Sequence, residues 1–140
     1  MNDTSSTRKK QWLAVAGWAL LLFLLSSIPG EDLDFIPPIF GWDKVGHFIL
    51  YGILGVLVFR ALSDRRSAFG LALLLCVAYG LLDEIHQIFI PGRTPSVWDL
   101  TADAIGATAG IQLLLIRIRR AGQKRRDPAS QAEDDRTPSQ

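Results

Sequence analysis

Residues 79–103 read YGLLDEIHQIFIPGRTPSVWDLTAD. The stretch begins inside an apolar run, yet it is dense in polar side chains, namely Asp83, Glu84, His86, Gln87, Arg93, Asp99 and Asp103. The flanking apolar runs indicate a lipid bilayer, in which a charge at the centre of a span costs about 2.5–3.5 kcal/mol on insertion scales. Because so many ionisable groups are costly there, the stretch predicts a functional site.

The composition indicates a small membrane protein. The chain has 140 residues, of which 49% are hydrophobic, and its formal net charge is +1. Between the two polar ends about a hundred residues remain, enough for four spans of about 20 residues with short connections. We therefore expect one membrane domain and no nucleic-acid partner. The only cysteine, Cys76, cannot form an internal disulfide, so cysteine usage identifies no redox compartment.

The expected fold class is all-α, a bundle of four transmembrane helices. The predicted spans are residues 12–28, 44–62, 68–90 and 97–118. They form one membrane domain over residues 12–118, between a polar N-terminus at 1–11 and a polar tail at 119–140. The tail lacks aromatic side chains and aliphatic ones larger than alanine, so we expect it to be disordered.

Local signals place the ends of these spans. Pro91 and Gly92 end the third span, because proline lacks an amide donor and glycine suits a turn. Ser96 is a good N-cap for the fourth span, with Asp99 three residues later as its capping partner. The basic lead and apolar run of the first span also resemble a secretory signal peptide. An uncleaved anchor is favoured, because the run is long and has no convincing small-x-small cleavage site.

Basic residues near the span ends predict the orientation. Lysine and arginine cluster before the first span, at 60–66 and at 117–120, whereas the connection at 29–43 is acidic. By the positive-inside rule, both termini are then cytoplasmic. Three of the four tryptophans stand near span ends, as interfacial aromatic belts predict, while Trp18 falls in the middle of a span.

Three predicted spans bring polar side chains to the outer side at a similar depth. Residues three or four apart on a helix share a face, so each span presents a polar stripe. The binding candidates are Asp43, Lys44, Tyr51, Gln87, Arg93, Asp99 and Asp103, and the catalytic candidates are His47 and Glu84. Arg93, in the connection after the third span, is the nearest obvious cation for this acidic set. We expect the stripes to face one another across the outer half of the bundle.

Several of these polar residues also have structural explanations. Asp43 and Asp99 can cap their helices and interact with the helix dipole, at a benefit of about 0.3–1 kcal/mol. Asp83 lies on another face of its helix and can face lipid headgroups, as can His86. Arg93 can tie its loop to Asp99, or bind an anionic group through paired hydrogen bonds.

Glycines at regular spacing predict close packing between helices. Gly106 and Gly110 form a small-xxx-small pair, which lets two helix backbones approach each other. The glycines at 46, 52 and 55 are expected to do the same on the second span.

The ordered motifs resemble those of the VanZ family of membrane proteins. The matching pieces are DKVGHFILYGILG at 43–55, YGLLDEIHQIFIPGRTPSVWDL at 79–100 and DAIGATAG at 103–110. As in the family pattern, they contain Asp-Lys-x-x-His with a tyrosine four residues later, then Asp-Glu-x-x-Gln, Pro-Gly-Arg and an aspartate. The resemblance covers nearly all of residues 12–116. It departs at Asp103, where the family more often has asparagine, and the extra carboxylate alters the charge balance of the site.

The resemblance implies a function at the cell envelope. The family is named for a protein associated with teicoplanin resistance. By resemblance, we expect a multi-pass protein of the bacterial cytoplasmic membrane, with its site on the extracytoplasmic side. That site would bind or modify a lipid-linked or glycopeptide-related envelope molecule.

Two other functions stay open. An acid-base enzyme, a hydrolase or transferase, would use His47 or Glu84 as general base on a lipid-linked substrate, with Arg93 stabilising anionic charge. A structural partner of another membrane protein would need no chemistry at the site. No cofactor is expected, because no spacing here is a recognised metal motif, although carboxylates with a histidine can hold a divalent cation.

Overall fold

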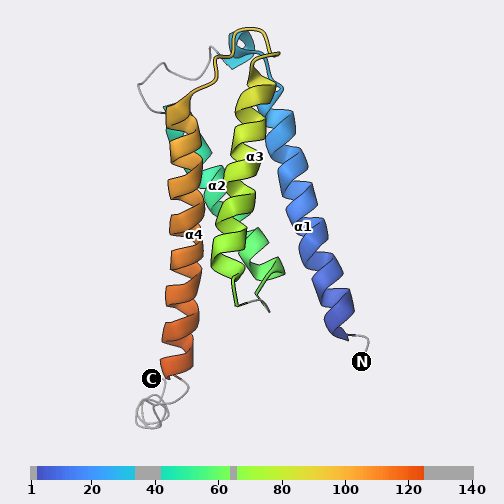
Figure 1. Cartoon of the computed structure of the whole chain (residues 1–140), viewed down its shortest axis with the longest axis vertical. Helices are drawn as coiled ribbons and strands as arrows, with labels where there is room; N and C mark the ends of the chain where they lie inside the picture. Colours follow the sequence, from blue (N-terminus) through green and yellow to red (C-terminus); the bar gives the residue numbers. More distant parts are fainter. Residues whose placement is uncertain (1–2, 34–41, 64–65, 125–140) are drawn as a thin grey trace, which may run out of the picture.

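The chain is a succession of α-helices (Figure 1). The structure, a computed structural model, describes residues 3–33, 42–63 and 66–124. In chain order its elements are α1 (Asp3–Ser26), the short 3-10 helix η1 (Gly30–Leu33), α2 (Trp42–Ala61), α3 (Ala68–Gln87) and α4 (Val97–Lys124). The described ranges contain no strand, so the predicted all-α class is confirmed.

The four long helices run alternately in opposite directions (Figure 1). The start of α1, the end of α2, the start of α3 and the end of α4 lie at one end of the molecule. The end of α1, the start of α2, the end of α3 and the start of α4 lie at the other end. This alternation brings together the helix ends that carry the polar stripes, although they are far apart in the sequence.

Three helices are long and apolar enough to cross a membrane, by length and composition. They are α2 over Asp43–Ala61, α3 over Ala68–Gln87 and α4 over Val97–Lys124. Helix α1 is not among them, since its first turns are polar and include the basic run from Arg8 to Lys10. The structure therefore supports a membrane protein with three helices that could span the bilayer. The bundle of four transmembrane helices stays a prediction.

Three helix ends differ from the predicted span ends by three residues or more. Helix α1 begins at Asp3, well before the first apolar residues, and α4 continues to Lys124. Arginine, lysine, glutamine and alanine are good helix formers, so a helix need not stop where its hydrophobic part stops. Helix α3 ends at Gln87, ahead of the predicted position 90.

Parts of the predicted organisation lie outside the described residues. They are the start of the N-terminus at 1–2, most of the acidic connection at 34–41, the centre of the basic turn at 64–65, and the tail at 125–140.

Helix α2 packs most extensively against α4, because glycines let the two backbones approach closely. A Cβ atom at Gly106 would collide with the carbonyl oxygen of Phe48, and one at Gly110 with that of Gly52. The predicted packing role is confirmed for Gly52, Gly55, Gly106 and Gly110. It is wrong for Gly46, where a Cβ would meet nothing within 4 Å.

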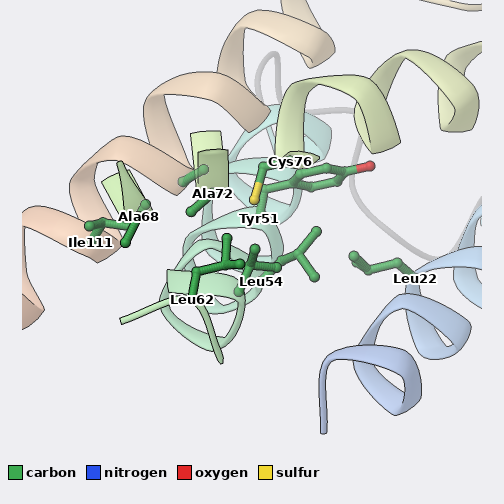
Figure 2. Close-up of a cluster of buried hydrophobic side chains, with 10 residues drawn as sticks. Leu22, Tyr51, Leu54, Leu62, Ala68, Ala72, Cys76 and Ile111 are labelled. Carbon is green, nitrogen blue, oxygen red and sulfur yellow. The ribbon is translucent and has the colours of Figure 1, made fainter. Parts of the chain in front are cut away.

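The apolar core lies beside this glycine contact. It draws side chains from all four long helices, including Leu22, Tyr51, Leu54, Leu62, Cys76 and Ile111, which Figure 2 labels. Cys76 is fully buried in this core. Tyr51 is its one polar member, and its ring also stacks beside the ring of His47.

Polar side chains attach α1 to α2 and α3 through backbone carbonyl groups. Trp18 Nε1 donates a hydrogen bond to the Leu50 carbonyl at 3.0 Å, and Tyr79 Oη donates one to the Ala19 carbonyl at 2.6 Å. Trp18, which fell in the middle of a predicted span, is thus explained by packing between helices. Helix α1 is thus attached to α2 and α3 by hydrogen bonds between side chains and backbone carbonyl groups.

Candidate functional site

A histidine–aspartate pair between α2 and α4 forms the centre of the site. His47 Nδ1 lies 3.0 Å from Asp103 Oδ1, and the side chain of Asp103 is fully buried while that of His47 is 17% exposed. A carboxylate can only accept a hydrogen bond, so in the neutral ring Nδ1 carries the proton and Nε2 is left as an acceptor. A partly accessible imidazole held by a buried carboxylate suits a general base or a metal ligand.

Asp103 fits between the helices because α3 has a glycine opposite it. A Cβ atom at Gly80 would lie 2.7 Å from Asp103 Oδ2 and 3.4 Å from the edge of the Tyr51 ring. Asp103 Oδ2 is itself buried and has no hydrogen-bond partner among the described residues. The carboxylate therefore has one oxygen fixed by His47 and one oxygen unpaired.

Glu84 connects the end of α3 to the start of α4. Its Oε2 accepts a hydrogen bond from the backbone amide of Ser96 at 2.6 Å. The sequence predicted Asp99 as the capping partner of Ser96, but this amide pairs with Glu84 from the neighbouring helix instead. Glu84 Oε1 is buried and has no partner within the described part of the chain. The Ser96 contact thus orients the carboxylate and leaves one oxygen available.

Lys44 supplies the positive charge next to these carboxylates. Its Nζ lies 2.7 Å from Asp43 Oδ2 and 3.0 Å from Asp99 Oδ1. The side chain of Asp43 is 54% exposed, whereas that of Asp99 is buried. Asp43 therefore belongs to the rim of the site, and Lys44 joins α2 to α4 through Asp99.

Tyr51 and Gln87 stand one helical turn after His47 and Glu84, respectively. The rings of His47 and Tyr51 are nearly parallel, with centroids 6.2 Å apart. Tyr51 is 1% exposed, and its hydroxyl group is buried with no partner among the residues described. Gln87 stands one helical turn beyond Glu84 and is also buried. The predicted polar faces of α2 and α3 thus point inward.

We call the following residues the polar cluster: Lys44, His47, Tyr51, Glu84, Asp99 and Asp103. They come from α2, α3 and α4, and Asp43 and Gln87 adjoin them. Asp83, which sequence position placed on another face, is buried too, with 7% of its surface exposed. From the sequence, only the position of Asp83 next to Glu84 could have indicated that its side chain is buried.

Arg93 and His86 contact α1 and lie apart from the polar cluster. Arg93 Nε donates to the Ile28 carbonyl at 3.1 Å, and Nη2 donates to the Leu25 carbonyl at 3.3 Å. His86 Nε2 lies 3.0 Å from Ser27 Oγ. The structure thus brings Arg93 neither to the cluster nor to Asp99, and gives it backbone carbonyls as partners. Lys44 takes the place beside the carboxylates that the sequence assigned to Arg93.

Comparison with known proteins identifies the family. The profile of the VanZ/LLP1 family matches residues 5–119, which include the whole polar cluster. The chain belongs to the VanZ/LLP1 family. An uncharacterized protein of Schizosaccharomyces pombe is 32% identical over 116 residues, covering 79% of this chain and 71% of that protein. No solved structure matches significantly.

In this VanZ/LLP1 protein, three side chains of the cluster have the composition of a metal site. One ring nitrogen of His47 and one carboxylate oxygen each of Glu84 and Asp99 all lie within 4.8 Å of one another. Each comes from a different helix, so no sequence spacing reveals the set. The arrangement can accept a proton at His47, bind a cation, or pair with the donors of a polar ligand.

Proposed function

We propose that this VanZ/LLP1 protein is a multi-pass membrane protein that binds or modifies a lipid-linked cell-envelope molecule at its polar cluster. The main support is a set of three buried oxygen atoms that have no partner in the described residues: Tyr51 Oη, Glu84 Oε1 and Asp103 Oδ2. Each unsatisfied buried polar group costs about 1–3 kcal/mol. A ligand that supplies hydrogen-bond donors or positive charge would remove that cost.

The position of the cluster suits an amphiphilic ligand. His47 and Lys44 are partly exposed and stand in the first turns of α2, while Glu84 stands in the last turn of α3. Trp98, at the start of α4, is 72% exposed, as expected for an interfacial tryptophan. A ligand with its polar head at the cluster would keep its lipid tail along the apolar helix surfaces.

Basic residues support an outward-facing cluster. Arg60 stands in the last turn of α2, and Arg117, Arg119 and Arg120 lie near the end of α4, so these charges stand at the end of the bundle opposite the polar cluster. By the positive-inside rule that end is cytoplasmic, together with both termini. The polar cluster then lies on the extracytoplasmic side, where a protein that holds an envelope precursor would alter the access of teicoplanin-type antibiotics.

The His47–Asp103 pair favours an acid-base enzyme as the second candidate. In this function His47 Nε2 takes a proton from a water molecule or hydroxyl group that attacks a lipid-linked substrate, and returns it to the leaving group as the bond to that group breaks. Asp103 fixes the ring and stabilises the charge that His47 gains. Lys44, in place of Arg93, stands nearest to stabilise an anionic group. General base catalysis contributes about 10²–10⁴-fold to a rate.

Binding is tested with the full chain in lipid nanodiscs and a polyprenyl-diphosphate-linked cell-wall precursor as probe. We expect the wild type to bind the probe, and the Glu84→Gln and His47→Ala variants to bind at least about tenfold more weakly, equivalent to 1.4 kcal/mol. The matched controls are Glu31→Gln, at an exposed glutamate, and His86→Ala, at the histidine that contacts Ser27. Both controls should bind like the wild type.

The same samples separate the alternatives. If the wild type binds no probe, or if all variants bind it equally, the polar cluster is not its site and the proposal is wrong. A new product formed by the wild type and lost in His47→Ala would establish the enzyme. Binding without any product would establish the binding protein.

A further inference from the structure

We infer that His47, Glu84 and Asp99 form a binding site for a divalent transition-metal ion such as Zn²⁺ or Mn²⁺. The three side chains offer one nitrogen and two carboxylate oxygens, all within 4.8 Å of one another. An ion about 2.0–2.2 Å from each ligand atom places pairs of ligand atoms about 3–4 Å apart. Small side-chain rotations are enough to close the set around an ion.

Glu84 is independent support, because it is oriented as a ligand and lacks a partner. The residue is 6% exposed, and its Oε2 is fixed by the Ser96 amide at 2.6 Å. Its Oε1 is buried and unpaired among the described residues. A carboxylate that is held by one oxygen, with the other unpaired beside a histidine, has the geometry of a metal ligand.

His47 is held in the way that metal-binding histidines are held. Such a histidine almost always donates its other ring N–H to a carboxylate or carbonyl group, which fixes the tautomer and the ring orientation. Here Asp103 Oδ1 lies 3.0 Å from His47 Nδ1, so Nε2 is the nitrogen left for an ion. Asp103 is then a positioning residue, and it acts on the ion through His47.

The charge of the cluster also favours a cation. The buried carboxylates of this end of the bundle are Asp83, Glu84, Asp99 and Asp103. Lys44, paired with Asp99, is the one ammonium group within ion-pair distance of any of them in the described residues. Buried charges must be paired, because an isolated charge in an apolar environment costs far more than a neutral polar group. A divalent ion offsets two of these negative charges.

The donor set selects the class of metal. Imidazole nitrogen suits Zn²⁺ and other transition ions, and carboxylate oxygen suits Mn²⁺ as well. Three protein ligands leave at least one coordination position open, as in catalytic rather than structural zinc sites. The metal site does not depend on the proposed lipid-linked ligand. If both exist, the open position is where a phosphate oxygen of that ligand would bind.

The test uses the full chain in detergent, carried on a tag without histidine, stripped with EDTA and titrated with Zn²⁺ or Mn²⁺ alone. We expect one ion per wild-type chain by calorimetry. Glu84→Gln and His47→Ala should each weaken binding at least tenfold, whereas Glu31→Gln and His86→Ala should not. Asp103→Asn keeps an acceptor for His47 Nδ1. Its affinity for the ion should therefore fall by an amount near the lower end of the 10–100-fold range that is typical when a residue holding a metal ligand is changed.

The spectrum of bound cobalt reports directly on the metal ligands. It should change when a ligand is removed, and not when a residue with a merely structural role is changed. Co²⁺ bound to the wild type should show visible d–d bands that shift in His47→Ala, because a nitrogen ligand is lost. Stripped wild type that binds no stoichiometric ion would overturn the inference, even if the variants fail to fold. Equal binding by all folded variants would overturn it too. The titration contains no lipid-linked probe, so metal binding can be observed even if the lipid-binding proposal fails. In the same way, the probe can bind even if no metal ion does.

Discussion

Two tyrosines of the bundle differ in what their hydroxyl groups contact. Tyr79 Oη donates a hydrogen bond to the Ala19 carbonyl at 2.6 Å and so helps to attach α1. Tyr51 Oη is buried without a partner among the described residues, although its ring is well packed beside His47. The first hydroxyl contributes to stability, whereas the second is a cost that the ligand-free protein bears.

We predict opposite effects when the two hydroxyl groups are removed. Tyr51→Phe should leave the free energy of unfolding unchanged or raise it by up to about 1–3 kcal/mol, because an unpaired buried hydroxyl is lost. Tyr79→Phe, the matched control, should lower it by about 0.5–1.5 kcal/mol. Reversible unfolding in mixed detergent micelles measures both. A larger loss for Tyr51→Phe than for Tyr79→Phe would show that Tyr51 has a partner in the free protein.

Asp103 shows how one residue changes the chemistry of the cluster. By resemblance the family more often has asparagine at this position. An asparagine oxygen could also accept a hydrogen bond from His47 Nδ1, but it would carry no charge. Here the carboxylate adds a negative charge that is fully buried, and its Oδ2 lies where Gly80 leaves room. We therefore expect this chain to bind a cation or a proton more strongly than an Asp103→Asn variant would.

At the scale of helices, the contact between α2 and α4 sets the geometry of the site. The backbones approach at Gly106, which faces Phe48, and this contact lies one turn or less from both His47 and Asp103. Because the helices are this close, side chains as short as aspartate and histidine reach each other directly. Larger residues at the contact would separate the pair.

Gly106→Ala tests this dependence. The new Cβ would collide with a backbone carbonyl that cannot rotate away, so we expect a loss of about 1–3 kcal/mol in the free energy of unfolding. Gly46→Ala on α2 is the matched control, since a Cβ there meets nothing within 4 Å. It should raise stability by about 0.5–1 kcal/mol, because alanine is the better helix former. If the two changes had equal effects on the free energy of unfolding, the close contact at Gly106 would not be a determinant of stability.

At the scale of the whole molecule, the connection after α3 attaches α1 to the other helices. Gly30 donates a backbone hydrogen bond to the Pro91 carbonyl at 2.9 Å, and Arg93 binds carbonyls at the end of α1. Gly92 lies against Gly30, where a side chain on Gly30 would collide with the Gly92 carbonyl group, and the φ of 72° at Gly92 would strain any other residue there. The Pro-Gly-Arg motif therefore has a structural explanation, which is to hold the first helix beside the site.

The predicted orientation of the molecule is tested by cysteine labelling of intact cells. Asp32→Cys, in η1 at the end of the bundle where α3 finishes and α4 begins, should react with a membrane-impermeant maleimide. Ser63→Cys, at the opposite end, should react only after permeabilisation, because we expect that end in the cytoplasm. The wild type is the control, since its single cysteine, Cys76, is buried. The reverse labelling pattern would contradict the outward-facing cluster.

The sequence by itself determined the helices, their order and the residues of the polar ends. Hydrophobic runs, the Pro91-Gly92 stop and the spacing of Gly106 and Gly110 are local patterns, and each can be recognised within a short stretch of sequence. Helix ends were less well predicted, because α1 and α4 include polar residues beyond their apolar parts.

Only the tertiary structure decided which polar groups meet. Arg93 and Lys44 are both cations near carboxylates in the sequence, but Arg93 binds carbonyls at and just after the end of α1, and Lys44 binds Asp99. Likewise Ser96 pairs with Glu84, and the His47, Glu84 and Asp99 set appears only when three helices are packed. Such contacts depend on the rotation and separation of whole helices. No pattern within a single helix encodes them.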